Sequence, residues 1–193
     1  MKKTKFTKDF DYYIDEYMYN CLSRKLRPKT MQSYEQTLRL FERWCLEEAN
    51  ITEPSQVLDS TIRHYICSLQ ERGKYTFYAA EDCAITYNPT RRRDFSQTVS
   101  TTTINNYIRN LKAFFTWYAD CTMESNPMEK IRQLHNDRKS QEYLEDHEVE
   151  KLLKIFDRSY YPEHRDFMLI MLILDTGMRL GECLKVTADD IDM

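Results

Sequence analysis

The stretch that decides the fold is Ser100–Tyr118, STTTINNYIRNLKAFFTWY, in the middle of the 193-residue chain. It opens with four hydroxyl residues, which suit a helix N-terminus because a Ser or Thr oxygen accepts a hydrogen bond from an unpaired backbone N–H. Apolar residues then recur at the spacing of one helical face. They are Ile104, Ile108, Leu111, Phe115 and Tyr118. The stretch therefore predicts a long amphipathic helix.

Three earlier stretches repeat this pattern and predict helices over about 9–26, 30–49 and 60–72. Arg27-Pro28 ends the first, since proline lacks a backbone donor and restricts the residue before it. Gly73 is expected to be the C′ residue of the third. The scarcity of glycine also favours an all-helical protein. The residues expected to face the core are Phe10, Tyr13, Ile14, Tyr17, Met18, Cys21, Leu22, Tyr34, Leu38, Phe41, Cys45, Ile62, Tyr65, Ile66 and Leu69.

Residues 74–99 separate the third helix from the fourth and are too long for a simple helix connection. They contain alternating aromatic residues, Asn88-Pro89 and three consecutive arginines, Arg91–Arg93. We expect an inserted loop, with room for a short hairpin. The arginines suit either a clamp on a nucleic-acid backbone or a loop kept in solvent, and the sequence does not choose between the two.

The expected domain boundary is the wholly polar stretch 135–142. It follows a break at Asn126-Pro127 and a short element around 128–134. The boundary separates a helical first domain, 1–134, from a second domain, 143–193.

The second domain is predicted to be mostly helical. Val149–Phe156 has the spacing of one helical face, and the apolar run Phe167–Leu174 implies a helix that is buried on most sides. Asp175–Gly177 ends that helix, and a short helix carries Arg179–Lys185. A strand is expected to begin in the stretch Ala188–Met193.

Composition and charge restrict the class of protein. With 41% hydrophobic and 31% charged residues, the chain is expected to be globular. No signal peptide or membrane span is evident, which predicts a soluble, cytoplasmic protein. The net charge is −3, yet residues 1–140 carry 22 Lys and Arg against 18 Asp and Glu, whereas residues 141–193 carry 6 against 13. Any polyanion is therefore expected on the first part.

The six cysteines and four histidines show no CxxC pair and no metal-ligand spacing. Free thiols, no metal site and no cofactor are expected. His64 and His147 are interpreted as structural, and Trp44 and Trp117 as residues at the edge of the core rather than platforms for bases.

The most informative string is Leu174–Lys185, LDTGMRLGECLK, followed by Asp189–Asp192, DDID. It resembles the first arginine box of the tyrosine recombinase (phage-integrase) family. Tyr143–Leu153, YLEDHEVEKLL, resembles the opening helix of that family's catalytic domain, although Glu145 stands where Ser or Thr is common. Ser125–Ile131, SNPMEKI, is similar to the exit of the family's core-binding domain.

The resemblance implies an all-α fold class. A four- to five-helix core-binding (SAM-like) domain is followed by a truncated, mostly helical start of the integrase catalytic domain. It also implies that Arg179 is catalytic and that Glu182 supports it. A planar guanidinium suits this role because it can donate two parallel hydrogen bonds to a phosphate that gathers charge. The alternative is that Arg179 and Glu182 are only a surface i, i+3 pair.

For the parent protein, the resemblance implies a metal-independent site-specific recombinase or integrase that acts as a homotetramer on duplex DNA through a covalent tyrosyl-DNA intermediate. In the family the remaining catalytic residues follow the first arginine box, so the chain is expected to bind DNA without cleaving it. One alternative is a naturally truncated integrase that acts as a non-enzymatic DNA-binding competitor. Another is a helical interaction module unrelated to DNA.

The family's core-binding domain presents two helices to the major groove, which implies DNA contact through polar stripes on the second and fourth helices. A solvated helix face is the alternative. The basic residues Lys2, Lys3, Lys5 and Lys8 suit either a phosphate-binding arm or a solubilising tail. The stripe residues are Arg27, Lys29, Gln32, Gln36, Arg39 and Arg43 on the second helix and Thr102, Asn105, Arg109, Lys112 and Thr116 on the fourth.

Overall fold

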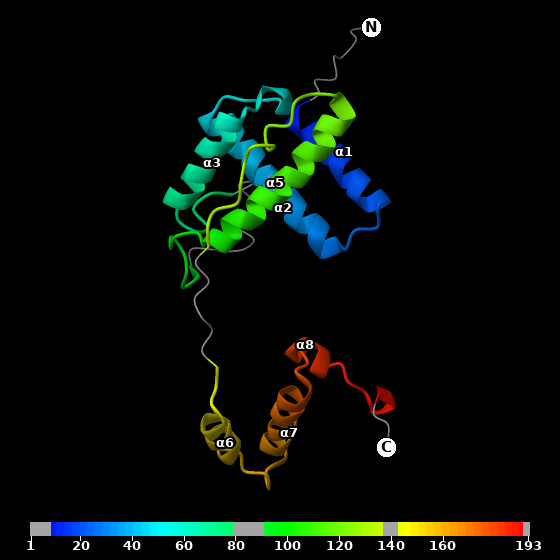
Figure 1. Ribbon diagram of the computed structural model, residues 1–193, viewed down its shortest axis with the longest axis vertical. Helices are drawn as coiled ribbons and strands as arrows, with labels where there is room; N and C mark the ends of the chain where they lie inside the picture. The colour runs from blue at the N-terminus through cyan, green and yellow to red at the C-terminus, as the bar shows by residue number, and fades with distance from the viewer. Residues whose placement is uncertain (1–8, 79–90, 137–142, 191–193) are drawn as a thin grey trace. The chain divides into compact units, whose positions relative to one another are not determined.

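The computed structural model describes residues 9–78, 91–136 and 143–190, and in those ranges every regular element is a helix, which confirms the predicted all-α fold (Figure 1). The chain divides into two compact units, residues 1–137 and 138–193. The helices of the first unit are α1 (Phe10–Ser23), α2 (Pro28–Glu48), α3 (Asp59–Glu71) and α5 (Thr101–Thr122). Those of the second are α6 (Asp146–Lys154), α7 (Tyr161–Thr176) and α8 (Leu180–Cys183).

Local chemistry fixes where the helices of the first unit begin. A carboxylate oxygen of Asp9 accepts a hydrogen bond from the N–H of Tyr12 at 3.0 Å, which caps α1. Pro28 begins α2, where its missing N–H costs nothing. The Ser100 hydroxyl accepts from the N–H of Thr103 at 3.3 Å, as the hydroxyl run predicts for α5.

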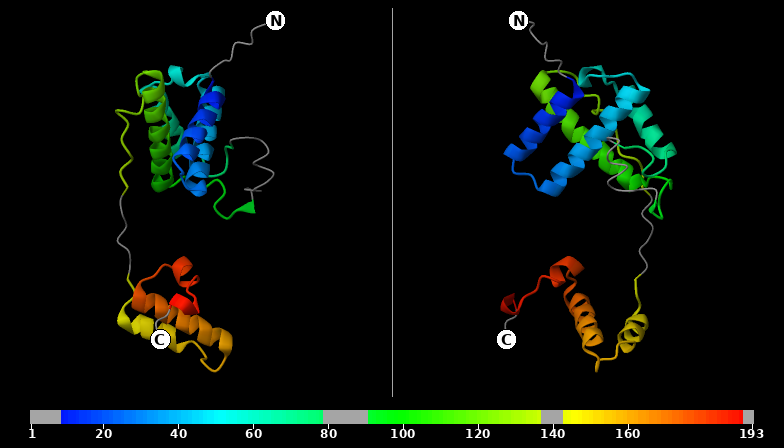
Figure 2. Two further views of the ribbon diagram at one scale, coloured as in Figure 1. Left: turned by 90° about the vertical axis from the view of Figure 1, so that its right-hand side faces the viewer. Right: turned by 180° about the vertical axis from the view of Figure 1, so that it is seen from behind.

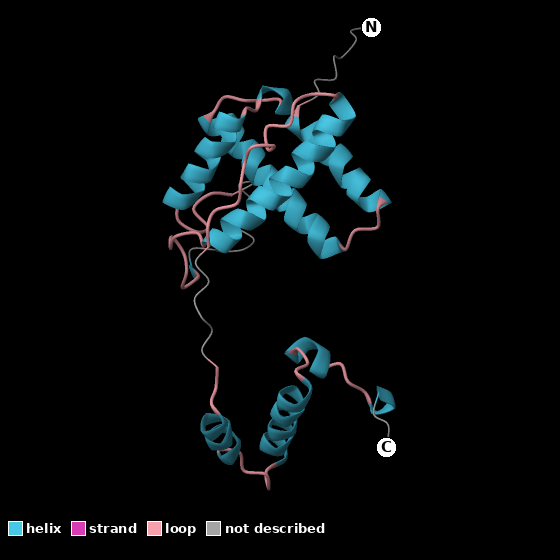
Figure 3. Cartoon of the chain, viewed as in Figure 1, coloured by secondary structure: helices cyan, strands magenta, loops and turns pink. Residues whose placement is uncertain are grey.

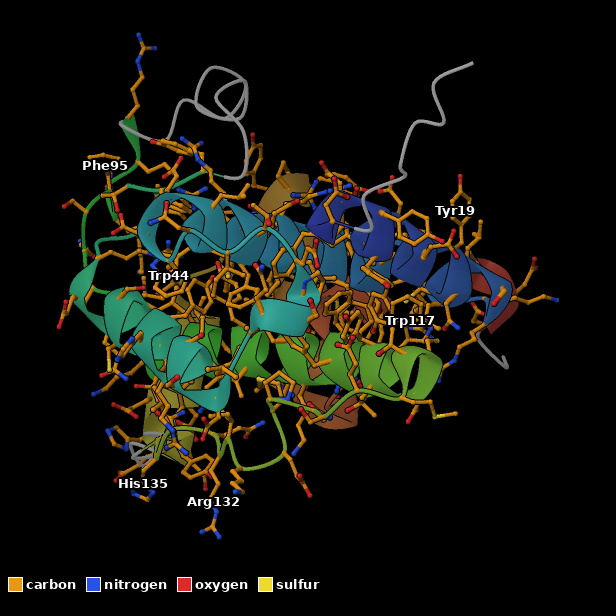
Figure 4. The ribbon with its side chains drawn as sticks, turned by 90° about the horizontal axis from the view of Figure 1, so that it is seen from above. Tyr19, Trp44, Phe95, Trp117, Arg132 and His135 are labelled. Carbon is orange, nitrogen blue, oxygen red and sulfur yellow. The ribbon has the colours of Figure 1, made fainter. Side chains whose placement is uncertain are left out.

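The first unit has two layers, with α1 and α2 in one and α3 and α5 in the other (Figures 2 and 4). The core between them is rich in aromatic rings packed edge to face, such as Phe41 with Tyr65 and Tyr17 with Phe114, whose centroids are 4.9 and 5.5 Å apart. Trp44 and Trp117 lie between the layers, whereas Tyr19 projects outward (Figure 4).

Most of the predicted core residues of the first unit are buried, but Leu22 is 60% exposed. The buried face of α1 is set by Ile14, Tyr17 and Cys21. Leu22 is one residue beyond Cys21, about 100° further around the helix, and therefore points away from that face. Tyr13, Met18 and Tyr34 are partly buried and pack against the core.

Gly73 follows the C-cap of α3, as expected, but it does not adopt the left-handed conformation that usually favours glycine there. Its backbone instead passes very close to Ser96. An added Cβ would lie 2.6 Å from the Ser96 Cα. Glycine is needed here for close approach between two segments of chain.

The described residues of the second unit differ from two expectations. The apolar run Phe167–Leu174 lies on α7, in which no residue is buried, because the described neighbours cover only part of the helix. The ring of Phe167 packs against that of Phe156, with centroids 6.4 Å apart. In the stretch 188–193, where the start of a strand is expected, Ala188–Asp190 is a 3₁₀ turn, closed by hydrogen bonds from the N–H and hydroxyl of Thr187 to the Asp190 carboxylate. Residues 191–193 lie outside the described residues.

Other expectations fall partly outside the described residues. Cys83, Asn88-Pro89 and the four N-terminal lysines lie in ranges that the structure does not describe. The other cysteines, at 21, 45, 67, 121 and 183, are free thiols. Within the described ranges, no helix has the length and apolar character needed to cross a bilayer.

Candidate nucleic-acid interface

A groove lies between the first turns of α2 and the first half of α5. Lys29 and Arg109 reach it from the two helices, and both side chains are exposed. Within the described ranges neither cation is paired with a carboxylate, and the guanidinium of Arg109 donates to the amide oxygen of Asn106. The groove therefore combines positive charge with neutral hydrogen-bonding groups. Its lining residues are Lys29, Thr30, Ser33, Tyr34, Asn106, Arg109 and Asn110.

A buried amide fixes the floor of this groove. The Asn110 side-chain nitrogen donates to the Ser33 carbonyl and hydroxyl, both at 3.1 Å, and to the Thr37 hydroxyl at 2.8 Å. The Thr37 hydroxyl in turn donates to the Ser33 carbonyl at 2.8 Å. These bonds cross from α5 to α2, so the relative position of the two helices is set by polar groups as well as by the apolar core.

Arg39, predicted to contact DNA, is held by acidic residues. Its guanidinium contacts the carboxylates of Asp11, Asp15 and Glu42, at 2.7 Å for Asp15 and 3.4 Å for Glu42. Two effects raise the pKa of the Glu42 carboxyl to about 7: burial is the larger, and repulsion from the Asp11 carboxylate is the smaller. The nearby Arg39 guanidinium offsets only part of this rise. The positive charge of Arg39 is therefore largely neutralised within the unit.

Arg43 is also engaged inside the chain. It forms an ion pair with Glu47 at 2.6 Å and donates to the Tyr78 carbonyl at 3.0 Å. Its guanidinium lies over the ring of Phe77, 5.4 Å from the centroid. Arg43 thus joins α2 to the segment that follows α3.

Thr102 and Asn105 hold the exit of the first unit. The Asn105 amide donates to the Leu134 carbonyl at 3.0 Å and accepts from the Leu134 N–H at 2.8 Å, as a neighbouring strand would. The Thr102 hydroxyl accepts from the Asn136 amide at 3.2 Å. Both side chains fix the departing chain against α5.

The other stripe residues are exposed on the surface. Among them, the Thr116 hydroxyl accepts from the Asn126 amide at 3.3 Å, whereas the other four make no side-chain hydrogen bond or ion pair within the described ranges and are available for a ligand. They are Arg27, Gln32, Gln36 and Lys112.

Sequence reasoning missed part of the groove. Asn106, Asn110 and Ser33 line it, although the predicted stripe on α5 ran through Asn105 and Lys112. The signal was the pair of asparagines four residues apart, one on each side of Arg109 in the sequence. Two amides four residues apart beside an arginine place three hydrogen-bonding groups on one helical face, which indicates a face that contacts another helix or a ligand.

In the second unit, a tight turn presents Arg179. Gly177 ends α7 in the left-handed conformation, with φ +66°, and its N–H donates to the Ile173 carbonyl at 2.8 Å. Arg179 is the N-cap residue of α8 and has an 86% exposed side chain, and its guanidinium donates to Glu182 at 3.2 Å. The other Glu182 oxygen accepts from the Arg179 N–H at 3.1 Å. One carboxylate therefore holds both the backbone and the side chain of Arg179.

In α6, the first helix of this unit, a glutamate three residues after the N-cap also accepts a hydrogen bond from the N-cap N–H. Glu145 occupies the N-cap but makes no side-chain cap. The Glu148 carboxylate accepts from the Glu145 N–H at 2.9 Å, which is the half of a capping box that the N3 side chain supplies. Two acidic side chains in the first turn also favour the helix dipole.

Comparison with known proteins finds tyrosine recombinases. The chain is 25% identical over 171 residues to the tyrosine recombinase XerC of Bacillus subtilis, covering 84% of this chain and 54% of that protein. It is 23% identical over 182 residues to the tyrosine recombinase XerD of Listeria innocua, covering 93% and 53%. XerC of Listeria monocytogenes is 23% identical over 185 residues, covering 95% and 51%.

The chain thus spans about half the length of the curated relatives it matches. No family model matches it. No solved structure matches it significantly. The similarity nevertheless runs through most of the chain, and the all-helical fold agrees with it. This similarity over most of the chain supports membership of the tyrosine recombinase family.

Proposed function

We propose that the first unit binds duplex DNA through the groove between α2 and α5, as part of a protein that carries out site-specific recombination. The observation that supports this best is the meeting of Lys29 and Arg109 in one groove. Two further cations of the predicted α2 stripe, Arg39 and Arg43, are neutralised within the chain. Of the stripe cations, Lys29, Arg109 and the exposed Arg27 and Lys112 therefore remain to attract phosphate, and two of these four meet in the groove.

The groove also offers groups that suit DNA beyond simple charge. The Asn106 amide and the Ser33 hydroxyl also line the groove, and such groups contact sugars, phosphates or base edges. Gln32 and Gln36 lie exposed on the same helix as Lys29. A duplex seated on the groove would meet cations at the phosphates and amides nearer the bases.

In the second unit, we assign Arg179 as the ligand of the phosphate at the DNA exchange point and Glu182 as the residue that positions it. The assignment is supported by the two hydrogen bonds from Arg179 to one carboxylate. They leave the remaining guanidinium N–H groups free for a second oxyanion.

The DNA-binding proposal is tested by fluorescence anisotropy of a labelled duplex at several salt concentrations. The double variant Lys29→Ala/Arg109→Ala is expected to bind more weakly. The negative slope of log K against log salt should become shallower by about 2, near 0.9 for each lost phosphate contact. Arg63→Ala is the matched control, because Arg63 is an exposed arginine on α3 that pairs with Asp59. Salt-independent binding by the unmodified protein, or none, would overturn the proposal.

A further inference from the structure

We propose that residues 73–78 and 91–99, here called the arm, form a second DNA-contacting surface, in which Arg91 and Arg93 bind the phosphate backbone beside the groove. The inference rests on the proposed function, since it concerns the same duplex. The arm connects α3 to α5 and is drawn as loop in Figure 3.

The base of the arm is fixed by backbone pairing. Gly73 and Thr98 form an antiparallel bridge, the Lys74 N–H donates to the Gln97 carbonyl at 2.7 Å, and the Ser96 N–H donates to the Lys74 carbonyl at 3.0 Å. The close approach of Gly73 to Ser96 leaves no room for a side chain at residue 73. The two ends of the arm are therefore held together.

The arm is also attached to the helices. The ring of Phe77 lies under the guanidinium groups of Arg43 from α2 and Arg72 at the end of α3, 5.4 and 4.9 Å from the ring centroid. The hydrogen bond from Arg43 to the Tyr78 carbonyl adds a polar contact to this attachment. An arm held at Phe77 and at its base cannot swing freely from the unit.

Some of the cations of the arm are paired with a carboxylate, and others are not. Asp94 lies 3.6 Å from Lys74 and 3.3 Å from Arg92, and Arg92 also stacks 4.4 Å over the ring of Tyr75. Arg91 and Arg93 are exposed, and their side chains form no ion pair with any described residue. One carboxylate thus serves the two structural cations, and two cations remain for an external anion.

The position of the arm favours duplex DNA as that anion. Val99 packs against the core and leads directly into α5, whose first turn begins at Thr101. Arg109 of the groove is eight residues further along the same helix, about 12 Å away along its axis. Duplex DNA carries a negative charge about every 1.7 Å of its axis, so a duplex on the groove presents further phosphates at this range.

The test compares salt slopes for duplex binding. Arg91→Ala/Arg93→Ala is expected to make the slope of log K against log salt shallower by about 2 relative to the unmodified protein. Arg91→Lys/Arg93→Lys should restore most of the slope, since phosphate contacts depend mainly on charge. Arg63→Ala again serves as the control for loss of a paired arginine. An unchanged slope for the alanine pair would overturn the inference while leaving the groove proposal intact.

A second variant tests the placement of the arm without removing charge. Gly73→Val is expected to displace the base of the arm, because the new side chain would meet the Ser96 backbone. Circular dichroism should show that the helices are retained. A folded Gly73→Val protein should then show a lower salt slope, and a slope equal to that of the unmodified protein would count against the arm as a fixed surface. If the unmodified protein shows no salt-dependent binding, the proposed function fails, and the inference fails with it.

Discussion

The Asn110 side-chain nitrogen lies 2.8 Å from the Thr37 hydroxyl, which joins two helices through residues 73 positions apart in the sequence. Both residues are buried. This contact makes the floor of the groove a polar junction, so the interface proposed for DNA and the stability of the first unit share the same residues.

Replacing Asn110 with Ala should therefore destabilise the protein. The Ser33 and Thr37 oxygens would lose a buried donor, which costs about 1–3 kcal/mol in free energy of unfolding. Urea denaturation measures the change. Gln36→Ala, on the exposed face of α2, should change the stability by less than about 0.5 kcal/mol. Equal stabilities for the two variants would contradict the structural role of the amide.

The raised pKa of Glu42 predicts a pH dependence of stability. A carboxyl with a folded-state pKa of about 7, above its ordinary value of 4.5, holds a proton more tightly in the folded protein than in the unfolded chain. Its stabilising effect is complete below pH 4.5 and is lost as the pH rises to about 7.

Glu42→Gln removes this titration. Relative to the variant, the unmodified protein should lose stability between about pH 4.5 and 7, by up to about 3 kcal/mol. Denaturation curves measured across that range test this. Parallel stability profiles for the two proteins would show that the carboxyl does not titrate differently on folding.

The left-handed backbone conformation of Met123 suggests a stabilising substitution. It closes α5 with φ +61° and a side chain that is 91% exposed, so its Cβ is strained without compensation from packing. Glycine removes the strain of about 1–2 kcal/mol but adds unfolded-chain entropy, leaving a net gain of about 0.5–1 kcal/mol for Met123→Gly. Thermal denaturation tests it. Met123→Ala keeps the Cβ and should show no comparable gain.

The helices could be predicted from the sequence because their signals are local. Apolar spacing, the Ser100 cap and Pro28 act within a few residues of the elements they define. The family could be predicted from the turn before Arg179, because that motif is also local in the chain.

The fate of the predicted DNA residues depends on contacts that are distant in the sequence. Arg39 meets carboxylates 24 and 28 residues away, and Arg43 meets a carbonyl 35 residues away. Helical periodicity identifies a polar face but not which other element covers it. For the same reason the sequence predicted a C′ role for Gly73 and missed the approach of Ser96.

The acidic residues around Arg39 yield a last prediction, which concerns DNA affinity. Asp11 and Asp15 extend from α1 to a guanidinium on the helix that carries Lys29. Replacing both with Asn removes two negative charges beside the proposed interface and releases Arg39 from two of its three partners. Duplex affinity should rise, and the salt slope should steepen by about 1 if Arg39 gains a phosphate contact.

A control separates that contact from a general change in charge. Glu16→Gln/Glu35→Gln removes the same number of negative charges from exposed positions on α1 and α2 without touching Arg39. This pair should leave the slope unchanged, since no cation is released. Adding Arg39→Ala to the Asp11→Asn/Asp15→Asn protein should cancel its gain in slope. If the steeper salt slope survives without Arg39, the acidic residues act only through long-range repulsion of the DNA. In that case Arg39 makes no phosphate contact.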